Sequence, residues 1–204
     1  MKINKITNVD LFTLFNSTLF FLMVKFVYYD RFITYRGAAN IHEFFFYATV
    51  IYAVILFFWI KLRHMKIPVY ILILFEIMIL LHFAAAFVEV NGHRLYDLRL
   101  FKVRFDKVVH FFNALLGTII TFYFFQKNKC HITLFMMMMT VFSVLGVGAI
   151  IEIAEYIVTL TVKNNGVGAY NNNMLDLVAN FLGSLTAALL FDLKLKKYVK
   201  GKDE

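Results

Sequence analysis

Long apolar runs alternate with short polar connections along the chain, and six of these runs have the length of a membrane-spanning helix. A hydrocarbon core of about 30 Å requires about 20 mainly apolar residues in helical conformation. The predicted spans cover residues 9–29, 41–60, 67–88, 106–125, 132–162 and 174–193. The pattern therefore predicts an all-α fold, a polytopic transmembrane helix bundle in which residues 1–204 form a single integral membrane domain.

The even number of predicted spans places both termini on the same side of the membrane. Lys and Arg residues are more numerous on the face that carries the termini than on the opposite face. Because cytoplasmic connections are enriched in these residues, both termini are predicted to be cytoplasmic. The fifth run is longer than a perpendicular helix needs, so it must tilt, kink near Gly146 and Gly148, or extend beyond the bilayer.

Composition and charge narrow the class of partner. Hydrophobic residues make up 61% of the chain and charged residues 17%, which leaves too little polar surface for a soluble domain. The net charge of +8 comes from residues spread over short connections. Membrane lipids with anionic headgroups are therefore the expected partner, and nucleic acid is not. The single cysteine, Cys130, excludes an internal disulfide and cannot by itself form a thiolate metal site.

The predicted external connection, residues 91–105, has basic residues interleaved with apolar ones. This pattern is typical of a segment that lies in the headgroup layer, with its apolar groups toward the acyl chains and its cations toward water. A solvated basic loop has the same pattern, and the sequence leaves both interpretations open.

The last three predicted spans carry polar residues at helical spacing near the same external membrane face. The rows are Asp106, His110 and Asn113 on the fourth span, Glu152 and Glu155 on the fifth, and Asn172, Asp176 and Asn180 on the sixth. An acidic side chain in the hydrocarbon costs about 2.5 to 3.5 kcal/mol, so the glutamates should face protein, water or a cation. We therefore expect the three rows to converge.

Several of these residues also have purely structural interpretations. Asp106 and Asp176 could cap the helices that begin near them. His110 could be a hydrogen-bonded core histidine, and Asn180 could serve only to hold two helices together. Glu152 and Glu155 lie inside a span, where no capping role is available.

Three ordered motifs carry a resemblance to the VanZ-like and YjdF-like bacterial membrane proteins. The matching segments are Asp-Lys-x-x-His-Phe at 106–111, Glu-x-x-Glu at 152–155, and Asn-x-x-x-Asp-x-x-x-Asn-x-x-Gly at 172–183. The match covers about residues 106 to 187. The last motif departs from the family pattern, because Asn172 stands where the family usually has Asp, and this reduces the negative charge available to a divalent cation.

The resemblance implies a small multi-pass protein of the bacterial cytoplasmic membrane. One branch of that group is associated with resistance to glycopeptide antibiotics that target the cell envelope. The resemblance implies no settled reaction.

The polar rows suggest an outward-facing site that binds or acts on a lipid or cell-envelope headgroup. In a hydrolytic version, Glu152 or Glu155 would act as general base on a water, and His110 would orient it or donate a proton. A divalent cation (Zn, Mn, Fe or Mg) is a possible cofactor. Its candidate ligands are Asp106, His110, Glu152, Glu155 and Asp176, and the candidate substrate contacts are Asn180, Asn172, Asn113 and Lys107.

Two other classes of function fit the same residues. A proton- or cation-coupled transporter would use the acidic side chains as a relay or as a substrate site. A non-catalytic scaffold, or an envelope-stress or antibiotic-resistance protein, would use them to lock the helices together.

Overall fold

The computed structural model describes residues 6–161 and 170–200 and shows an almost entirely helical chain. The chain divides into two compact units, Met1–Leu72 and Ile73–Glu204. The boundary falls in the first turn of helix α4, Val69–Phe87.

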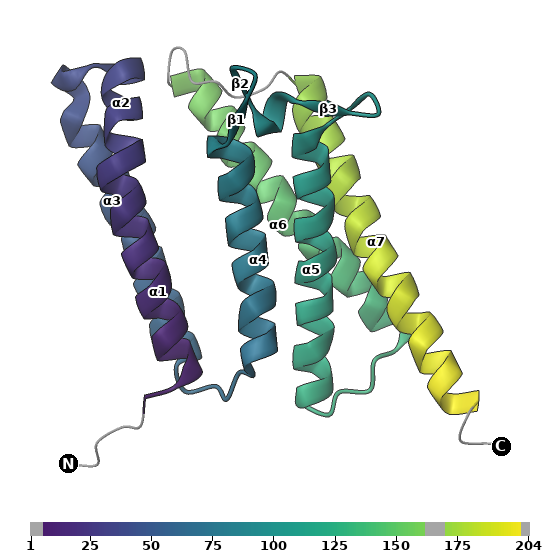
Figure 1. Cartoon of the computed structure of the whole chain (residues 1–204). Coiled ribbons are helices and arrows are strands. Elements are labelled where there is room, and N and C mark those ends of the chain that lie inside the picture. Colours follow the sequence, from purple (N-terminus) through teal and green to yellow (C-terminus); the bar gives the residue numbers. More distant parts are fainter. Residues whose placement is uncertain (1–5, 162–169, 201–204) are drawn as a thin grey trace, which may run out of the picture. The chain divides into compact units, whose positions relative to one another are not determined.

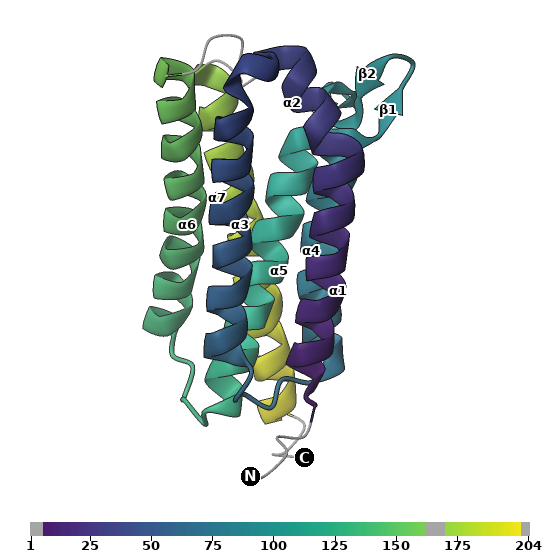
Figure 2. The ribbon, with the colours of Figure 1, turned by 90° about the vertical axis from the view of Figure 1, so that its left-hand side faces the viewer.

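The first unit is a helical hairpin. Helix α1 (Asn8–Met23) continues through a π-helical turn (Val24–Tyr28) into α2 (Tyr29–Arg36), and a short 3₁₀ turn (Ala38–Asn40) leads to α3 (Ile41–Leu62). Figure 2 shows α2 leading over the end of the hairpin toward α3. A capping box between Thr7 and Asp10 begins α1, and the Asp10 carboxylate also accepts a hydrogen bond from Trp59 of α3 at 2.7 Å. These contacts tie the two long helices together at one end.

The second unit contains most of α4, then α5 (Phe105–Lys127), α6 (Leu134–Thr161) and α7 (Tyr170–Lys200). Figure 1 shows α6 and α7 inclined to α5. The apolar core at one end contains Phe122, Met137, Val141 and Ala188. The Phe122 ring stacks on Phe191 with centroids 4.5 Å apart, which joins α5 to α7.

Glycines allow α7 to approach both neighbouring helices closely. A Cβ atom at Gly183 would collide with the backbone carbonyl of Phe111 on α5, and one at Gly148 of α6 would collide with the Asn180 amide. Small residues at helix crossings let backbones meet inside a membrane, where dispersion contacts replace the hydrophobic effect as the driving force.

The structure confirms the predicted polytopic helix bundle. In the part of the chain that the structure describes, five helices are long and apolar enough to cross a membrane: Asn8–Thr34, Ala38–Leu62, Phe105–Lys127, Leu134–Ile157 and Tyr170–Leu193. The third predicted span corresponds to α4, whose apolar part, Val69–Ala85, is shorter. Its 19 residues nevertheless extend about 28 Å at 1.5 Å per residue. Helix α6, with 28 residues, is about 42 Å long and exceeds the thickness of the hydrocarbon core.

The connection between α4 and α5 forms two small β-hairpins that the sequence analysis did not predict. The first pairs β1 (Glu89–Val90) with β2 (His93–Arg94), and the second pairs β3 (Arg99–Leu100) with β4 (Val103–Arg104). A 3₁₀ turn, Leu95–Asp97, lies between them. Strands of two residues are too short to show an alternating pattern.

The close crossing of α5 and α7 predicts a large effect of adding one methyl group. Gly183→Ala should force the two backbones apart and lower the free energy of unfolding by about 1 to 3 kcal/mol, the range typical of overpacking. Thermal unfolding in detergent measures this. Gly146→Ala is the matched control, because nothing lies within 4 Å of the added atom. Equal stability of the two variants would contradict the crossing.

Candidate functional site

Figure 1 shows that α5 and α7 begin at the end where α6 finishes. The polar rows of the second unit lie at this end. Asp106 and Lys107 lie in the first turn of α5, and Asp176 lies in the second turn of α7. Helix α6 runs in the opposite direction and brings Glu152 and Glu155 to the same end. Helix direction and residue spacing thus place all three rows together, as the sequence predicts.

Lys107 lies at the centre of a buried ion-pair network. Its Nζ atom lies 2.7 Å from Asp176 Oδ1 and 3.1 Å from Asp106 Oδ2. It also donates to the backbone carbonyl of Asn172 at 3.0 Å and to the Asn172 side-chain oxygen at 2.9 Å. Lys107 is only 8% exposed and Asp176 only 2%, so these contacts join α5 to α7 away from water.

Arg104, directly before α5, extends the network into the loop. Its guanidinium donates to the Asn172 side-chain oxygen at 2.9 Å and to Asp97 at 2.8 Å, and lies 3.5 Å from Asp106. Asp97 also pairs with Arg94 at 2.8 Å. The amide of Asn172 donates to Asp176 Oδ2 at 2.9 Å. The asparagine therefore bridges cations and a carboxylate at once, which an aspartate in its place could not do as a donor.

The network contains equal numbers of opposite charges. Asp97, Asp106 and Asp176 are matched by Arg94, Arg104 and Lys107. Two carboxylates on α6, Glu152 and Glu155, lie near this network, and neither forms an ion pair with a cation within residues 6–161 and 170–200. If both are ionised, the site carries two excess negative charges in a medium of low dielectric constant.

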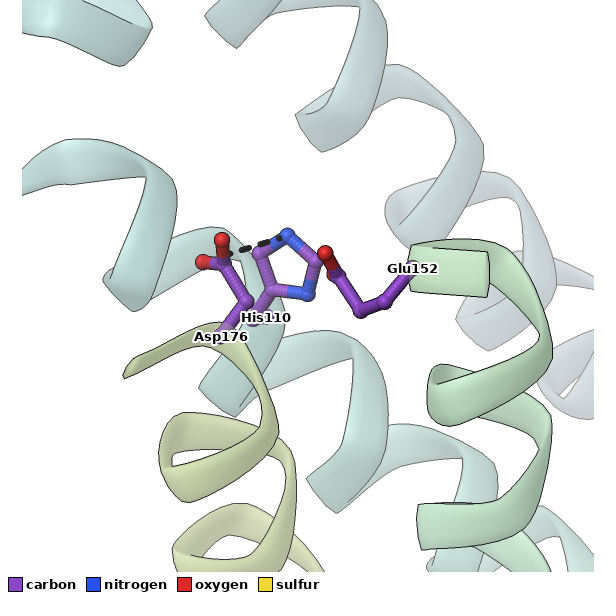
Figure 3. A group of neighbouring side chains, drawn as sticks. All are labelled: His110, Glu152 and Asp176. Carbon is purple, nitrogen blue, oxygen red and sulfur yellow. Dashed lines mark ion pairs between the residues drawn. The ribbon is translucent and has the colours of Figure 1, made fainter. Parts of the chain in front are cut away.

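Figure 3 shows His110, Glu152 and Asp176 turned toward one another from three different helices. His110 Nε2 lies 3.4 Å from Asp176 Oδ1. One potential ligand atom from each of the three side chains lies within 4.8 Å of the others. Glu152 is 5% exposed, and neither of its oxygens has a hydrogen-bond partner among the residues that the structure describes. A buried carboxylate in that situation is expensive unless something else satisfies it.

A cavity of about 560 Å³ opens beside this cluster. Its polar lining includes His82, Tyr96, His110, Glu155, Asn172, Asp176 and Asn180. Further along the helices, the lining becomes mostly apolar, with Met78, Ala114, Val144 and Val147. The cavity is therefore polar at the loop end and mainly apolar at greater depth.

Tyr96 covers the polar end of the cavity from the loop. Its hydroxyl lies 2.6 Å from His82 Nδ1 of α4. Burial raises the pKa of the Tyr96 phenol, and the negative charges of Glu155 and Asp106 raise this pKa further. Tyr96 is thus a neutral hydrogen-bonding group at neutral pH.

The structure distributes the predicted site residues over three environments. Asp106, Lys107 and Asn172 belong to the ion-pair network, and Asp176 belongs both to it and to the group with His110 and Glu152. Glu155, Asn113 and Asn180 line the cavity, to which Asp106, His110, Asn172 and Asp176 also contribute. Asp106 and Glu155 were predicted as metal ligands together with His110, Glu152 and Asp176, but they are not in the close group of three.

Sequence reasoning missed Arg104, Tyr96 and Asp97 as parts of the site. All three belong to the 91–105 connection, which was considered only as a headgroup-layer segment or a solvated loop. The signal available was weak: Arg104 lies two residues before Asp106, so it had to be near Asp106 and Lys107 wherever the fourth span began.

The fold and the site together define a multi-pass helical membrane protein with a buried charged cluster and an adjoining cavity. The chain belongs to the family described as predicted membrane protein (DUF2238), whose model matches residues 12–197. This match does not by itself identify the VanZ-like or YjdF-like group. No curated protein and no solved structure shows significant similarity to the chain.

The Lys107 network predicts a strong dependence of stability on one side chain. Lys107→Met should lower the free energy of unfolding by about 3 to 5 kcal/mol, because it leaves buried carboxylates without their cation. Thermal unfolding in detergent would show this loss. Lys129→Met, in an exposed loop, is the control and should unfold like wild type. A Lys107 variant as stable as that control would mean that the network does not hold α5 and α7 together.

Proposed function

We propose that the cavity of the second unit binds an amphiphile, a membrane lipid or a lipid-linked cell-envelope precursor, with its headgroup at the charged end. The observation that carries the proposal is the gradient along the cavity wall, from Tyr96, His110 and Asp176 to Met78, Val144 and Val147. A ligand with one polar and one apolar end matches that gradient. A uniformly polar solute would leave the deeper, mostly apolar wall without complementary contacts.

The headgroup end offers both donors and acceptors. Arg94 and Arg104 line the cavity and can donate to phosphate or carboxylate oxygens. Glu155 and Asp176 line it as well and can accept from hydroxyl, amine or amide groups. This mixture suits a phosphate joined to a sugar or an amino alcohol better than a simple anion, which the excess carboxylates would repel.

If the protein also acts on its ligand, Glu155 is the better placed general base. It lies in the cavity wall and is partly exposed, whereas Glu152 is buried. A base must reach the water or hydroxyl whose proton it removes. His110, which also lines the cavity, would then orient that water or donate a proton to the leaving group.

We further propose that the cavity faces the external leaflet of a bacterial cytoplasmic membrane, with both termini in the cytoplasm. The charge distribution of the connections and the resemblance to VanZ-like and YjdF-like proteins support this placement. An external site suits a cell-envelope ligand.

A scaffold role is the second candidate, because Lys107, Asp106 and Asp176 form a network whose contacts are sufficient to hold two helices together. That role does not use the cavity. Filling the cavity without touching the network therefore separates the two candidates.

Val144→Phe should place a larger side chain in the apolar part of the cavity and reduce the lipid that remains bound through purification several-fold. Mass spectrometry of extracted lipid, with wild type purified in parallel, measures this. Ile150→Phe is the matched control, because Ile150 is exposed on α6 and lies outside the cavity lining. A Val144 variant that folds normally and retains the lipids of wild type would argue for the scaffold.

A further inference from the structure

Glu152 is the most unusual buried group in the second unit. Glu152 belongs to the candidate membrane span Leu134–Ile157, and its carboxylate is 5% exposed and has no hydrogen-bond partner among the described residues. The nearby cation Lys107 already contacts Asp106, Asp176 and Asn172. Something that the protein chain does not supply should therefore satisfy Glu152.

The surroundings of Glu152 have the chemistry of a metal site. One imidazole nitrogen and two carboxylate oxygens, from His110, Glu152 and Asp176, lie within 4.8 Å of one another. Small side-chain movements would bring all three to the roughly 2.0 to 2.2 Å at which zinc binds such ligands. Imidazole with carboxylates suits Zn²⁺, Mn²⁺ or Fe²⁺, whereas Mg²⁺ and Ca²⁺ prefer oxygen ligands alone.

Asp176 is held in place as metal-binding carboxylates usually are. Its Oδ1 accepts from Lys107 and its Oδ2 accepts from Asn172. Each carboxylate oxygen has a second lone pair, so both contacts leave room for a metal. Such outer contacts fix the orientation of a ligand and commonly contribute 10- to 100-fold to metal affinity.

The charges point to a divalent ion. The three aspartates of the network are balanced by Arg94, Arg104 and Lys107, which leaves the two glutamates of α6 in excess. An ion of charge +2 would neutralise both. Its protein ligands number three, so coordination positions toward the cavity would remain open, as in catalytic rather than structural zinc sites.

We infer that His110, Glu152 and Asp176 bind a divalent transition-metal ion whose open positions face the cavity. This inference rests on the proposed function for the ligand, because the ion would bind a phosphate or carboxylate oxygen of the headgroup. The inferred site has fewer ligands than the sequence predicted. Asp106 pairs with Lys107 and is not a ligand, and Glu155 lines the cavity.

The test uses the full chain in detergent, stripped with a chelator, incubated with Zn²⁺ or Mn²⁺ alone, and freed of unbound ion. Elemental analysis should find one ion per chain in wild type, and the ion should raise the melting temperature. Glu152→Gln and His110→Asn should each weaken binding at least about tenfold, since each removes a ligand. Glu89→Gln, an exposed glutamate of β1, should bind like wild type.

The outcomes separate this inference from the proposed function. Wild type without bound ion, or ion bound equally by wild type and Glu152→Gln, would overturn the metal site. Bound lipid is measured on the same samples. If the protein retains lipid but binds no metal, only the metal inference is wrong. If it binds metal but retains no lipid, only the headgroup proposal is wrong.

A second inference comes from the tip of the β3–β4 hairpin and rests on observations other than those of the cavity. Phe101 and Lys102 form its two-residue turn with φ of 49° and 72°. This left-handed conformation favours Asn and Gly, the residues that the β1–β2 turn has at 91 and 92. Phe101 is also 100% exposed, between half-exposed Leu100 and Val103. A strained, fully exposed aromatic side chain suggests a function outside the folded unit.

We infer that the tip of this hairpin inserts into the headgroup layer beside α5. The hairpin ends at Arg104, directly before α5 begins, and Figure 1 shows it projecting sideways from that end. The exposed Lys102 in the turn and the exposed Arg99 beside it match anionic lipid phosphates. The hairpin would thus hold the mouth of the cavity at a fixed depth in the bilayer.

Tryptophan quenching in proteoliposomes tests the hairpin. Phe101→Trp should lose fluorescence to brominated phospholipid beyond the background that Trp59 gives in wild type. Asn91→Trp, at the equivalent turn of the polar β1–β2 hairpin, should instead be quenched by aqueous iodide. Iodide quenching of both variants would show that the 91–105 connection is a solvated loop.

Discussion

A lysine buried between two helices sets the geometry of the polar end of the second unit. Lys107 of α5 contacts Asp176 and Asn172 of α7 and Asp106 of its own helix. Because Lys107 and Asp176 are buried, sliding one helix along the other would leave charges buried without a partner, at a cost of several kcal/mol. Gly183, two turns after Asp176, lies against the backbone of Phe111, one turn after Lys107. The close approach at that crossing allows a side chain as short as aspartate to reach across.

The polar residues of the second unit have two roles: some hold the helices in position, and others are available to a ligand. Lys107, Arg104, Asp106 and Asp176 are each held by several contacts, which suits positioning. Glu152 has no hydrogen-bond partner among the described residues, and His110 and Glu155 line the cavity where a ligand would bind. If the acidic residues only held the helices together, a cation or hydrogen-bond donor beside each glutamate would add stability. Glu152 instead is buried with no hydrogen-bond partner among the described residues. The proposed ion and headgroup account for this difference within one site.

The spans could be predicted because a helix in lipid must be apolar over a known length. The convergence of the three rows could be predicted because alternate helices run in opposite directions. The partners of each residue could not. Asp106 and Lys107 are adjacent, and neighbouring positions do not face each other on a helix, yet the long lysine side chain reaches Asp106 and α7 together. The parts that Arg104 and Tyr96 play in the site could not be predicted either. Both belong to a connection whose two-residue strands are too short to recognise in the sequence.

The bare backbone at Gly148 governs more than helix packing. Gly148 lies one turn before Glu152 on the same face of α6, and its missing side chain is what lets the Asn180 amide rest against that helix. An alanine there would bring its methyl group against the Asn180 amide nitrogen, and the asparagine side chain would have to turn away from α6. Asn180 lines the cavity. One methyl group added to α6 would therefore reshape the cavity wall through a residue of α7, with every charged side chain of the site left in place.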